Sequence, residues 1–187
     1  MKVAFVIFNQ MTALDFIGIY DPLTRLRSMG LMPELNWDIC AYTQSVVDDK
    51  ELVFIPTKVA EPLDTYDLLI VPGGFGTRTL IKDKVFIEWL KTAAACELKT
   101  SVCTGSLLLG AAGFLKGKRA TTHPNAFAEL EEYCERVVDQ RIVVEGDVVT
   151  ARGVTSAIDL GLYLVESFVG EEGKEKIRKQ MDYLMES

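Results

Sequence analysis

The 187-residue sequence contains only one histidine, His123, and only four cysteines: Cys40, Cys96, Cys103 and Cys134. A single imidazole excludes any metal site or catalytic triad that needs two histidines. The cysteines form no Cys-x-x-Cys pair, which argues against a zinc site and against a dense disulfide framework. Four dispersed thiols are typical of a protein from a reducing compartment, so we expect a cytoplasmic protein.

Basic residues are also in short supply, since 20 lysines and arginines face 27 acidic residues and the formal net charge is -7. A nucleic-acid surface needs clustered Lys and Arg, so we expect no nucleic-acid partner. No stretch approaches the ~18 apolar residues of a membrane span. The first apolar run, residues 3–8, is shorter than a signal-peptide core of ~7 to 15 residues with its cleavage site. These absences leave a small molecule as the expected partner.

Motifs for bound nucleotides and metals are incomplete. Residues 113–118 lack the spacing and the hydroxyl residue of a P-loop, and Gly74-Phe75-Gly76 lacks the third glycine of a dinucleotide site. No combination of carboxylates with the lone histidine supports a metal. The sequence therefore predicts neither a cofactor nor a metal.

Short apolar segments alternate with amphipathic ones along the chain. Strands are predicted at residues 3–8, 35–42, 67–71, 100–102, 136–138, 141–145 and 148–151, with a hairpin at residues 45–56. Helices are predicted at residues 15–29, 84–96, 105–112, 127–134, 156–169 and 171–184. This alternation predicts an α/β fold with a doubly wound, mostly parallel sheet, helices on both faces and a small appended hairpin. No linker interrupts it, so we expect a single domain over residues 1–187.

Ligands of such sheets bind beyond the carboxyl ends of the strands. The turn around Cys103 lies at such an end, between a predicted strand and a helix of small residues. Ser101 and Gly105 flank it at two positions on either side, which is the pattern of a nucleophile elbow. The helix that follows is expected to lower the pKa of the Cys103 thiol and favour the thiolate. The other three cysteines are interpreted as structural.

Neighbours of this turn are candidates for the site, each with a structural alternative. Asp15 is either a helix N-cap or a proton carrier that faces the same crevice. Gly73 and Gly74 either form a turn or supply backbone oxyanion donors. Thr104 either donates from its hydroxyl or merely begins a helix. His123 either returns to the same edge of the sheet or sits in a tight turn before a proline.

With these residues in view, the sequence resembles the ThiJ/PfpI superfamily, which is related in fold to class I glutamine amidotransferases. Within it, the resemblance is greatest to isonitrile (isocyanide) hydratases. The most specific match is the block from Ser101 to His123, which also occurs in AraC-type regulators. Shorter matches are Leu14-Asp15 with Gly18 and Asp21, Val71 to Gly74, and Gly153 to Thr155 with Ile158-Asp159.

The resemblance implies a flavodoxin-like α/β sandwich that forms a homodimer. It also implies that Cys103 attacks the isonitrile carbon, that Asp15 shuttles the proton, and that water releases an N-substituted formamide. Thr104 and the amides of Gly73 and Gly74 would assist, and the matched Gly18 and His123 would contribute to substrate binding.

This sequence departs from the family pattern at several positions. Thr104 stands where PfpI-type peptidases place a histidine, and no histidine follows His123 to form the His-x-Glu pair of amidotransferases. Ile19 and Pro124 replace a proline and a tryptophan of the hydratase-like pattern. Arg152 stands beside Ala151 where small residues are usual, so we expect it to narrow the crevice or to recruit an anionic substrate.

Two alternatives to a hydratase stay open at this point. One is a glyoxalase- or deglycase-like enzyme that acts on 2-oxoaldehydes, as some superfamily members do. The other is a non-catalytic small-molecule or redox sensor, like the AraC-type relatives. Because we find no helix-turn-helix region before Ser187, such a sensor would act through a partner.

Overall fold

The computed structural model, described here for residues 1–184, is built around a seven-stranded sheet with the strand order β10-β11-β7-β6-β1-β2-β5. Every neighbouring pair is parallel except β10 and β11. Along β2-β1-β6-β7-β11 the parallel strands follow the order 2-1-3-4-5 of flavodoxin-like folds, so the predicted fold class is confirmed. The strands are β1 Lys2–Val6, β2 Asn36–Ala41, β5 Lys58–Val59, β6 Leu68–Val71, β7 Leu98–Val102, β10 Ile142–Glu145 and β11 Val148–Ala151.

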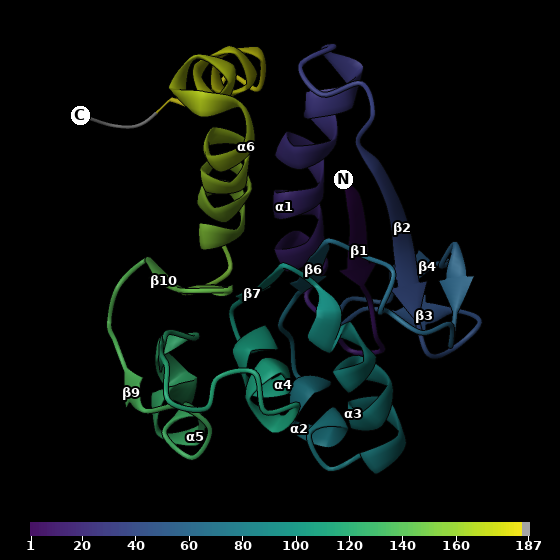
Figure 1. Ribbon diagram of the computed structural model, residues 1–187. Coiled ribbons are helices and arrows are strands. Elements are labelled where there is room, and N and C mark those ends of the chain that lie inside the picture. The colour runs from purple at the N-terminus through teal and green to yellow at the C-terminus, as the bar shows by residue number, and fades with distance from the viewer. Residues whose placement is uncertain (185–187) are drawn as a thin grey trace.

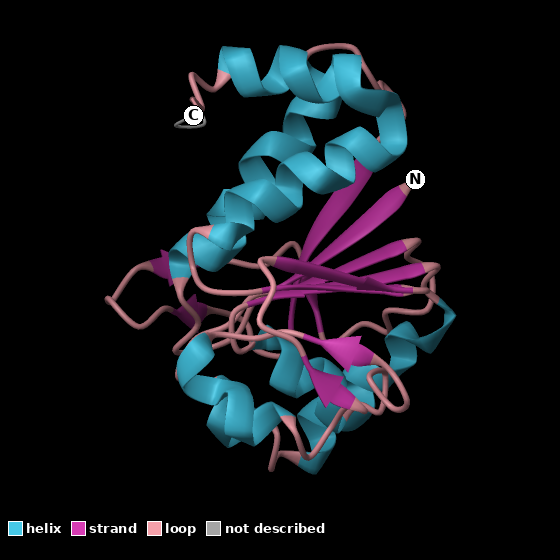
Figure 2. Cartoon of the chain, turned by 90° about the vertical axis from the view of Figure 1, so that its left-hand side faces the viewer, coloured by secondary structure: helices cyan, strands magenta, loops and turns pink. Residues whose placement is uncertain are grey.

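Helices cover both faces of this sheet, as predicted. One face carries α1 (Ala13–Ser28) and α6 (Ser156–Gln180), which pack against each other (Figures 1 and 2). The other face carries the shorter helices, which are α2 Thr77–Leu80, α3 Lys84–Lys91, α4 Gly105–Ala111 and α5 Phe127–Leu130, with 3-10 turns at Thr92–Ala95 and Pro124–Ala126. Strands covered on both sides must be apolar throughout, which explains why all four residues of β6 are buried.

The contact between α1 and α6 depends on small residues. A Cβ atom on Gly18 would lie 2.7 Å from the Cβ of Ala157, and one on Gly161 would lie 2.4 Å from the ring of Pro22. Hydrogen in place of a side chain lets the two helices approach closely. Gly18 is therefore explained by helix packing.

The predicted hairpin is present as a separate two-stranded sheet of β3 (Val46–Val47) and β4 (Val53–Phe54). The ring of Phe54 packs edge-on against Phe16 of α1, with 5.9 Å between the centroids, and this contact anchors the hairpin to the helix. A further short sheet pairs β8 (Arg119–Ala120) with β9 (Arg136–Val137).

The structure differs from the predicted elements mainly where they are short. The helices α2 and α5 have four residues each, and α2 was not predicted, because so short a segment shows no periodicity. The two final helices meet at Gly170, whose φ of 78° lies in the left-handed region that glycine adopts readily. In the part of the chain that the structure describes, none of the helices is both long and apolar enough to cross a membrane.

Candidate active site

The site forms where the strand order reverses, because β1 has β2 on one side and β6 on the other. The loops that follow β1 and β6 meet there in an isolated bridge between Met11 and Gly74. The next strand, β7, is in register with β6 so that Val71 lies opposite Ser101. Cys103, two residues past Ser101, is thus delivered to the same edge of the sheet as the loop after Val71.

Cys103 occupies a tight turn between β7 and α4. Its φ of 55° is in the left-handed region, which is unfavourable for a residue with a side chain. The turn is held by its backbone: the Cys103 N–H donates to the Arg152 carbonyl at 2.7 Å, and its carbonyl accepts from the Thr122 hydroxyl at 2.9 Å. Gly105 is required because a Cβ there would lie 2.3 Å from the carbonyl oxygen of Val71.

Asp15 lies within the first turn of α1 and is fully buried. Thr12 precedes the helix, so Asp15 is not the N-cap. Its Oδ2 accepts from the Gly73 N–H at 2.9 Å, whereas its buried Oδ1 has no hydrogen-bond partner among residues 1–184. Burial raises the pKa of Asp15 to about 7, and the Gly73 hydrogen bond offsets part of the increase. Near neutral pH this carboxyl group therefore exchanges readily between its two protonation states.

The thiol of Cys103 and the carboxyl group of Asp15 are close enough for each to shift the pKa of the other. Burial, followed by the negative charge of Asp15, raises the pKa of Cys103 to about 12, although the Thr104 backbone N–H acts in the opposite direction. The sequence-based expectation of a lowered pKa is thus wrong. The helix that follows has only seven residues, and its effect is outweighed by burial beside an acid. The raised pKa favours the neutral thiol at neutral pH.

The amides of Gly73 and Gly74 are already used within the protein. The Gly73 N–H binds Asp15, and the Gly74 N–H donates to the Thr104 hydroxyl oxygen at 2.9 Å. That hydroxyl in turn donates to the Gly74 carbonyl at 3.1 Å. A Cβ on Gly73 would lie 2.8 Å from the Cβ of Cys103 and 2.5 Å from the Thr104 nitrogen. The two glycines thus position Asp15 and Thr104. Their amides are not free to act as oxyanion donors, which was one of the two roles considered from the sequence.

A cavity of about 210 Å³ opens beside the sulfur. It is smaller than the ~300–1,000 Å³ of typical ligand pockets, so it suits a small molecule. Four residues proposed from the sequence line it, namely Gly74, Cys103, Thr104 and His123. Five others were missed, namely Thr12, Phe75, Arg78, Asn125 and Val154. The position of the loops after the first and third predicted strands was the only available signal for Thr12, Phe75 and Arg78.

His123 lies on the wall of this cavity and precedes the 3-10 turn Pro124–Ala126. Its Nδ1 accepts from the Asn125 N–H at 3.2 Å. That bond requires an unprotonated Nδ1, so the neutral ring carries its hydrogen on Nε2. His123 is therefore arranged as a hydrogen-bond donor.

Arg152 does not line the cavity. Its guanidinium pairs with Asp139 at 3.0 Å and lies over the ring of Phe127. The cation that lines the cavity is Arg78 of α2, which pairs with Glu129 of α5 at 2.6 Å. Gly18 is also absent from the cavity wall because it serves the contact between α1 and α6.

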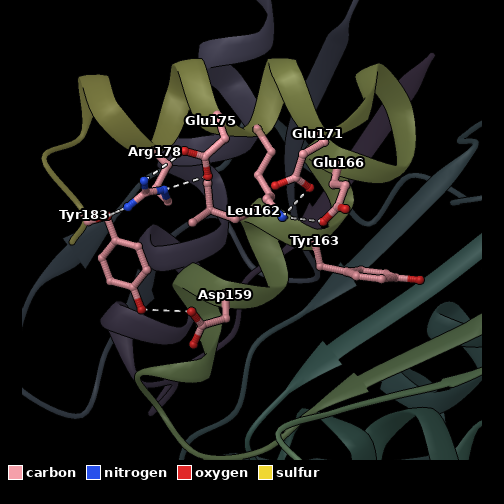
Figure 3. Close-up of a pocket in the computed structure, with 9 residues that line it drawn as sticks. Asp159, Leu162, Tyr163, Glu166, Glu171, Glu175, Arg178 and Tyr183 are labelled. Carbon is pink, nitrogen blue, oxygen red and sulfur yellow. Dashed lines mark hydrogen bonds and ion pairs between the residues drawn. The ribbon is translucent and has the colours of Figure 1, made fainter. Parts of the chain in front are cut away.

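A second cavity, of about 430 Å³, lies beside the break in α6 (Figure 3). Lys174 pairs there with Glu166 at 2.7 Å and with Glu171 at 2.8 Å, and Arg178 pairs with Glu175 at 2.8 Å. The wall is completed by Asp159, Leu162, Tyr163 and Tyr183. Its acidic residues do not amount to a metal site, since residues 1–184 contain no cluster of three or more His, Cys, Asp or Glu side chains suited to a metal ion.

Comparison with known proteins agrees with this geometry. The model of the DJ-1/PfpI family matches residues 1–167. The chain belongs to the DJ-1/PfpI family. A curated member, the isonitrile hydratase of Pseudomonas putida, is 36% identical over 185 residues, which cover 98% of this chain and 78% of that protein. The resemblance noted in the sequence is thereby confirmed.

Other members of the DJ-1/PfpI family carry different names. A glutathione-independent glyoxalase of Caenorhabditis elegans is 29% identical over 143 residues, which cover 76% of this chain and 73% of that protein. Among solved structures, a ThiJ/PfpI family protein from Pseudomonas syringae superposes with a TM-score of 0.89 at 28% identity, covering 100% of this chain and 76% of its own. Family membership thus establishes the fold and leaves the reaction to be argued from the site.

Proposed function

We propose that this protein is a hydratase that adds water to a small isonitrile and releases an N-substituted formamide. The observation that carries the proposal is the pair of Cys103, which lines one small cavity, and Asp15, a buried acid with a pKa near 7 that lies close to the Cys103 thiol. The similarity to an isonitrile hydratase over nearly the whole chain supports the same reaction.

The reaction follows from the two side chains. Asp15 as a carboxylate accepts the proton of the Cys103 thiol, and the sulfur forms a bond to the terminal isonitrile carbon while Asp15 returns the proton to that carbon. The product is a thioimidate, with sulfur, hydrogen and nitrogen on the former isonitrile carbon. Water then adds to this carbon while one of its protons moves to the nitrogen, and the carbon–sulfur bond breaks as the second proton of that water goes to the sulfur. The net change is the addition of one water molecule.

The raised pKa of Cys103 is consistent with these reaction steps. A thiol that keeps its proton until substrate binds carries that proton to the place where the isonitrile carbon needs it. Asp15 is suited to the transfer because its pKa of about 7 lies near the usual working pH, where a group can both accept and donate a proton. Because the resting thiol keeps its proton, the carboxylate of Asp15 does not face a second buried negative charge.

Turnover of several small isonitriles, followed by the appearance of the formamide in NMR spectra, tests this function. The wild-type protein is expected to produce formamide, and Cys103→Ala is expected to produce none. Cys134→Ala is the matched control, because that thiol lies outside the cavity and is expected to keep wild-type turnover. Absence of turnover with every isonitrile, or unchanged turnover in Cys103→Ala, contradicts the proposal.

The second candidate is glutathione-independent glyoxalase activity, which the similarity to the Caenorhabditis elegans enzyme favours. The same thiol would add to the aldehyde of a 2-oxoaldehyde, and Asp15 would transfer protons. Conversion of methylglyoxal to lactate without glutathione separates this activity from isonitrile hydration. A redox-sensing role is less well supported, because oxidation favours exposed thiolates, whereas Cys103 is buried and has a raised pKa.

We further propose a homodimer in the cytoplasm. Exposed apolar side chains gather on α1 and on the β3–β4 hairpin that Phe54 anchors to it, namely Leu14, Ile17, Leu52, Val53 and Ile55. Exposed apolar side chains on elements that pack together are a feature of interfaces. Light scattering after size exclusion is expected to give twice the mass of 20.8 kDa, and Leu14→Glu combined with Val53→Glu is expected to give a monomer. A wild-type monomer overturns this assignment.

A further inference from the structure

The cavity beside Cys103 has one charged lining side chain, that of Arg78. Arg78 lies on α2, which begins three residues after Gly74, so its position relative to the sulfur is fixed by the same loop that positions Thr104. An arginine remains cationic at any working pH. A ligand that reaches Cys103 therefore shares a small cavity with one permanent positive charge.

We propose that Arg78 determines substrate specificity by binding a carboxylate, so that the preferred substrates are small isonitriles carrying a carboxylate a few atoms from the isonitrile carbon. The inference rests on the proposed hydratase function, whose reacting groups it leaves unchanged. It replaces the sequence-based expectation that Arg152 recruits an anionic substrate, since Arg152 pairs with Asp139 outside the cavity wall.

Arg78 has hydrogen-bonding capacity to spare. A guanidinium has five N–H donors, and the Arg78 side chain uses Nη2 to bind Glu129 at 2.6 Å, its one side-chain hydrogen bond within residues 1–184. Arg178 in the larger cavity is different, since Nε and Nη2 bind Glu175 and Nη1 binds the Tyr183 carbonyl. Arg78 is therefore equipped to bind a second carboxylate, whereas all three nitrogens of Arg178 already donate to partners.

The existing partner of Arg78 is easy to rearrange. Both Arg78 and Glu129 have 39% of their side chains exposed, and exposed ion pairs contribute little to stability. A substrate carboxylate thus competes with Glu129, or binds next to it, at little cost. The rest of the ligand meets apolar surface, because Phe75 and Val154 also line the cavity.

The charge of Arg78 also offsets a repulsion. The chain has a net charge of -7, and Asp15 is negative whenever it acts as the base. A substrate with a carboxylate would be disfavoured in this environment without a cation in the cavity. Charge-assisted hydrogen bonds from an arginine commonly change affinity by about ten-fold or more.

Isocyanoacetate and its methyl ester form a test pair that differs in one negative charge. The wild-type protein is expected to show a kcat/KM about ten-fold higher for the carboxylate than for the ester. Arg78→Gln is expected to lose this preference through a higher KM for the carboxylate. Arg178→Gln, the matched control, is expected to keep it. A wild-type preference for the ester, or an unchanged preference in Arg78→Gln, overturns the inference.

Alkylation of Cys103 gives a readout that does not depend on isonitrile turnover. Iodoacetate and iodoacetamide have similar size and differ in charge, and peptide mass spectrometry reports the rate at Cys103 for each. Arg78→Gln is expected to lower the ratio of the iodoacetate rate to the iodoacetamide rate several-fold, and Glu129→Gln is expected to raise it. An equal ratio in Arg78→Gln and wild type overturns the role of Arg78. A lowered ratio without any isonitrile turnover supports that role and refutes the hydratase function alone.

Discussion

Two of the cavities within residues 1–184 differ in both size and chemistry. The larger one, beside the break in α6, is about 430 Å³ and is lined by charged side chains that pair with one another. The smaller one, about 210 Å³, is lined by the buried thiol of Cys103, and the buried carboxyl group of Asp15 lies close to that thiol. The larger of these two cavities is therefore not the one that contains the reactive groups.

The pKa shifts in the two places run in opposite senses. In the larger cavity, hydrogen bonds between partners lower the pKa of Glu166 and Glu175 and raise the pKa of Lys174, so these three groups are held in their charged forms. At the smaller cavity, burial raises the pKa of Asp15 and of Cys103, so both are driven toward their neutral forms. Ion pairs of the first kind are ordinary surface structure, whereas groups of the second kind are expected where protons are transferred.

The largest effect expected from this comparison is on catalysis. Asp15→Asn removes the proton carrier, and loss of a general acid–base group commonly lowers kcat by about 10²- to 10⁴-fold. Asp159→Asn, the same change at the larger cavity, is expected to alter kcat by less than about two-fold, because that carboxylate serves no proton transfer. Steady-state turnover of an isonitrile gives kcat for both variants. Equal losses of kcat would mean that Asp15 has no special role in proton transfer.

The dependence of wild-type kcat/KM on pH also tests the role of Asp15. Asp15 must be ionised to accept the thiol proton, so kcat/KM is expected to fall as the pH drops through about 7, the pKa of this group. A profile that stays flat down to pH 5 would show that the carboxyl group has an ordinary pKa and is not the base.

The second prediction concerns stability. The folded pKa of Asp15 is raised from 3.8 to about 7, so the native state holds its proton more tightly than the unfolded chain. The stability linked to this proton is complete below pH 4 and is lost as the pH rises through 7, in total on the order of 4 kcal/mol. Asp15→Asn carries no such charge. Relative to wild type, it is therefore expected to gain about this free energy of unfolding between pH 4 and pH 8.

Urea unfolding of wild type and Asp15→Asn at pH 4, 6 and 8 measures this difference. A constant offset between the two proteins at all three values would show that the carboxyl group is not desolvated in the native state. Asp159→Asn again serves as the control.

Much of the fold could be predicted from the sequence because each element is indicated by a short stretch of neighbouring residues. The apolar runs that became β1 and β6 needed no knowledge of their neighbours, and the small residues around Cys103 marked the turn directly. Asp15 was identified because helices that follow strands begin at the same edge of the sheet. These inferences depend on a few adjacent residues, which is why they succeeded.

The rest depends on contacts between distant residues. The pKa of Cys103 is decided by burial beside Asp15, 88 positions away in the chain, and the short helix that follows says nothing about it. Likewise, the amide of Gly73 is committed to Asp15 and so is not free for a substrate. Arg78 was missed because a four-residue helix leaves no periodic pattern, and Arg152 was the only cation that the sequence suggested for the crevice.

The smallest effect is expected in the larger cavity. Lys174→Met removes the cation shared by Glu166 and Glu171 and keeps most of the apolar stem of the side chain. Because partly exposed ion pairs contribute little, the Tm is expected to fall by no more than about 3 °C, and less in 1 M salt, where such pairs are screened. Isonitrile turnover is expected to stay within about two-fold of wild type, since Lys174 and its ion-pair partners take no part in proton transfer. A large loss of turnover in this variant would mean that the break in α6 communicates with Cys103, and the separation of the two cavities would then have to be abandoned.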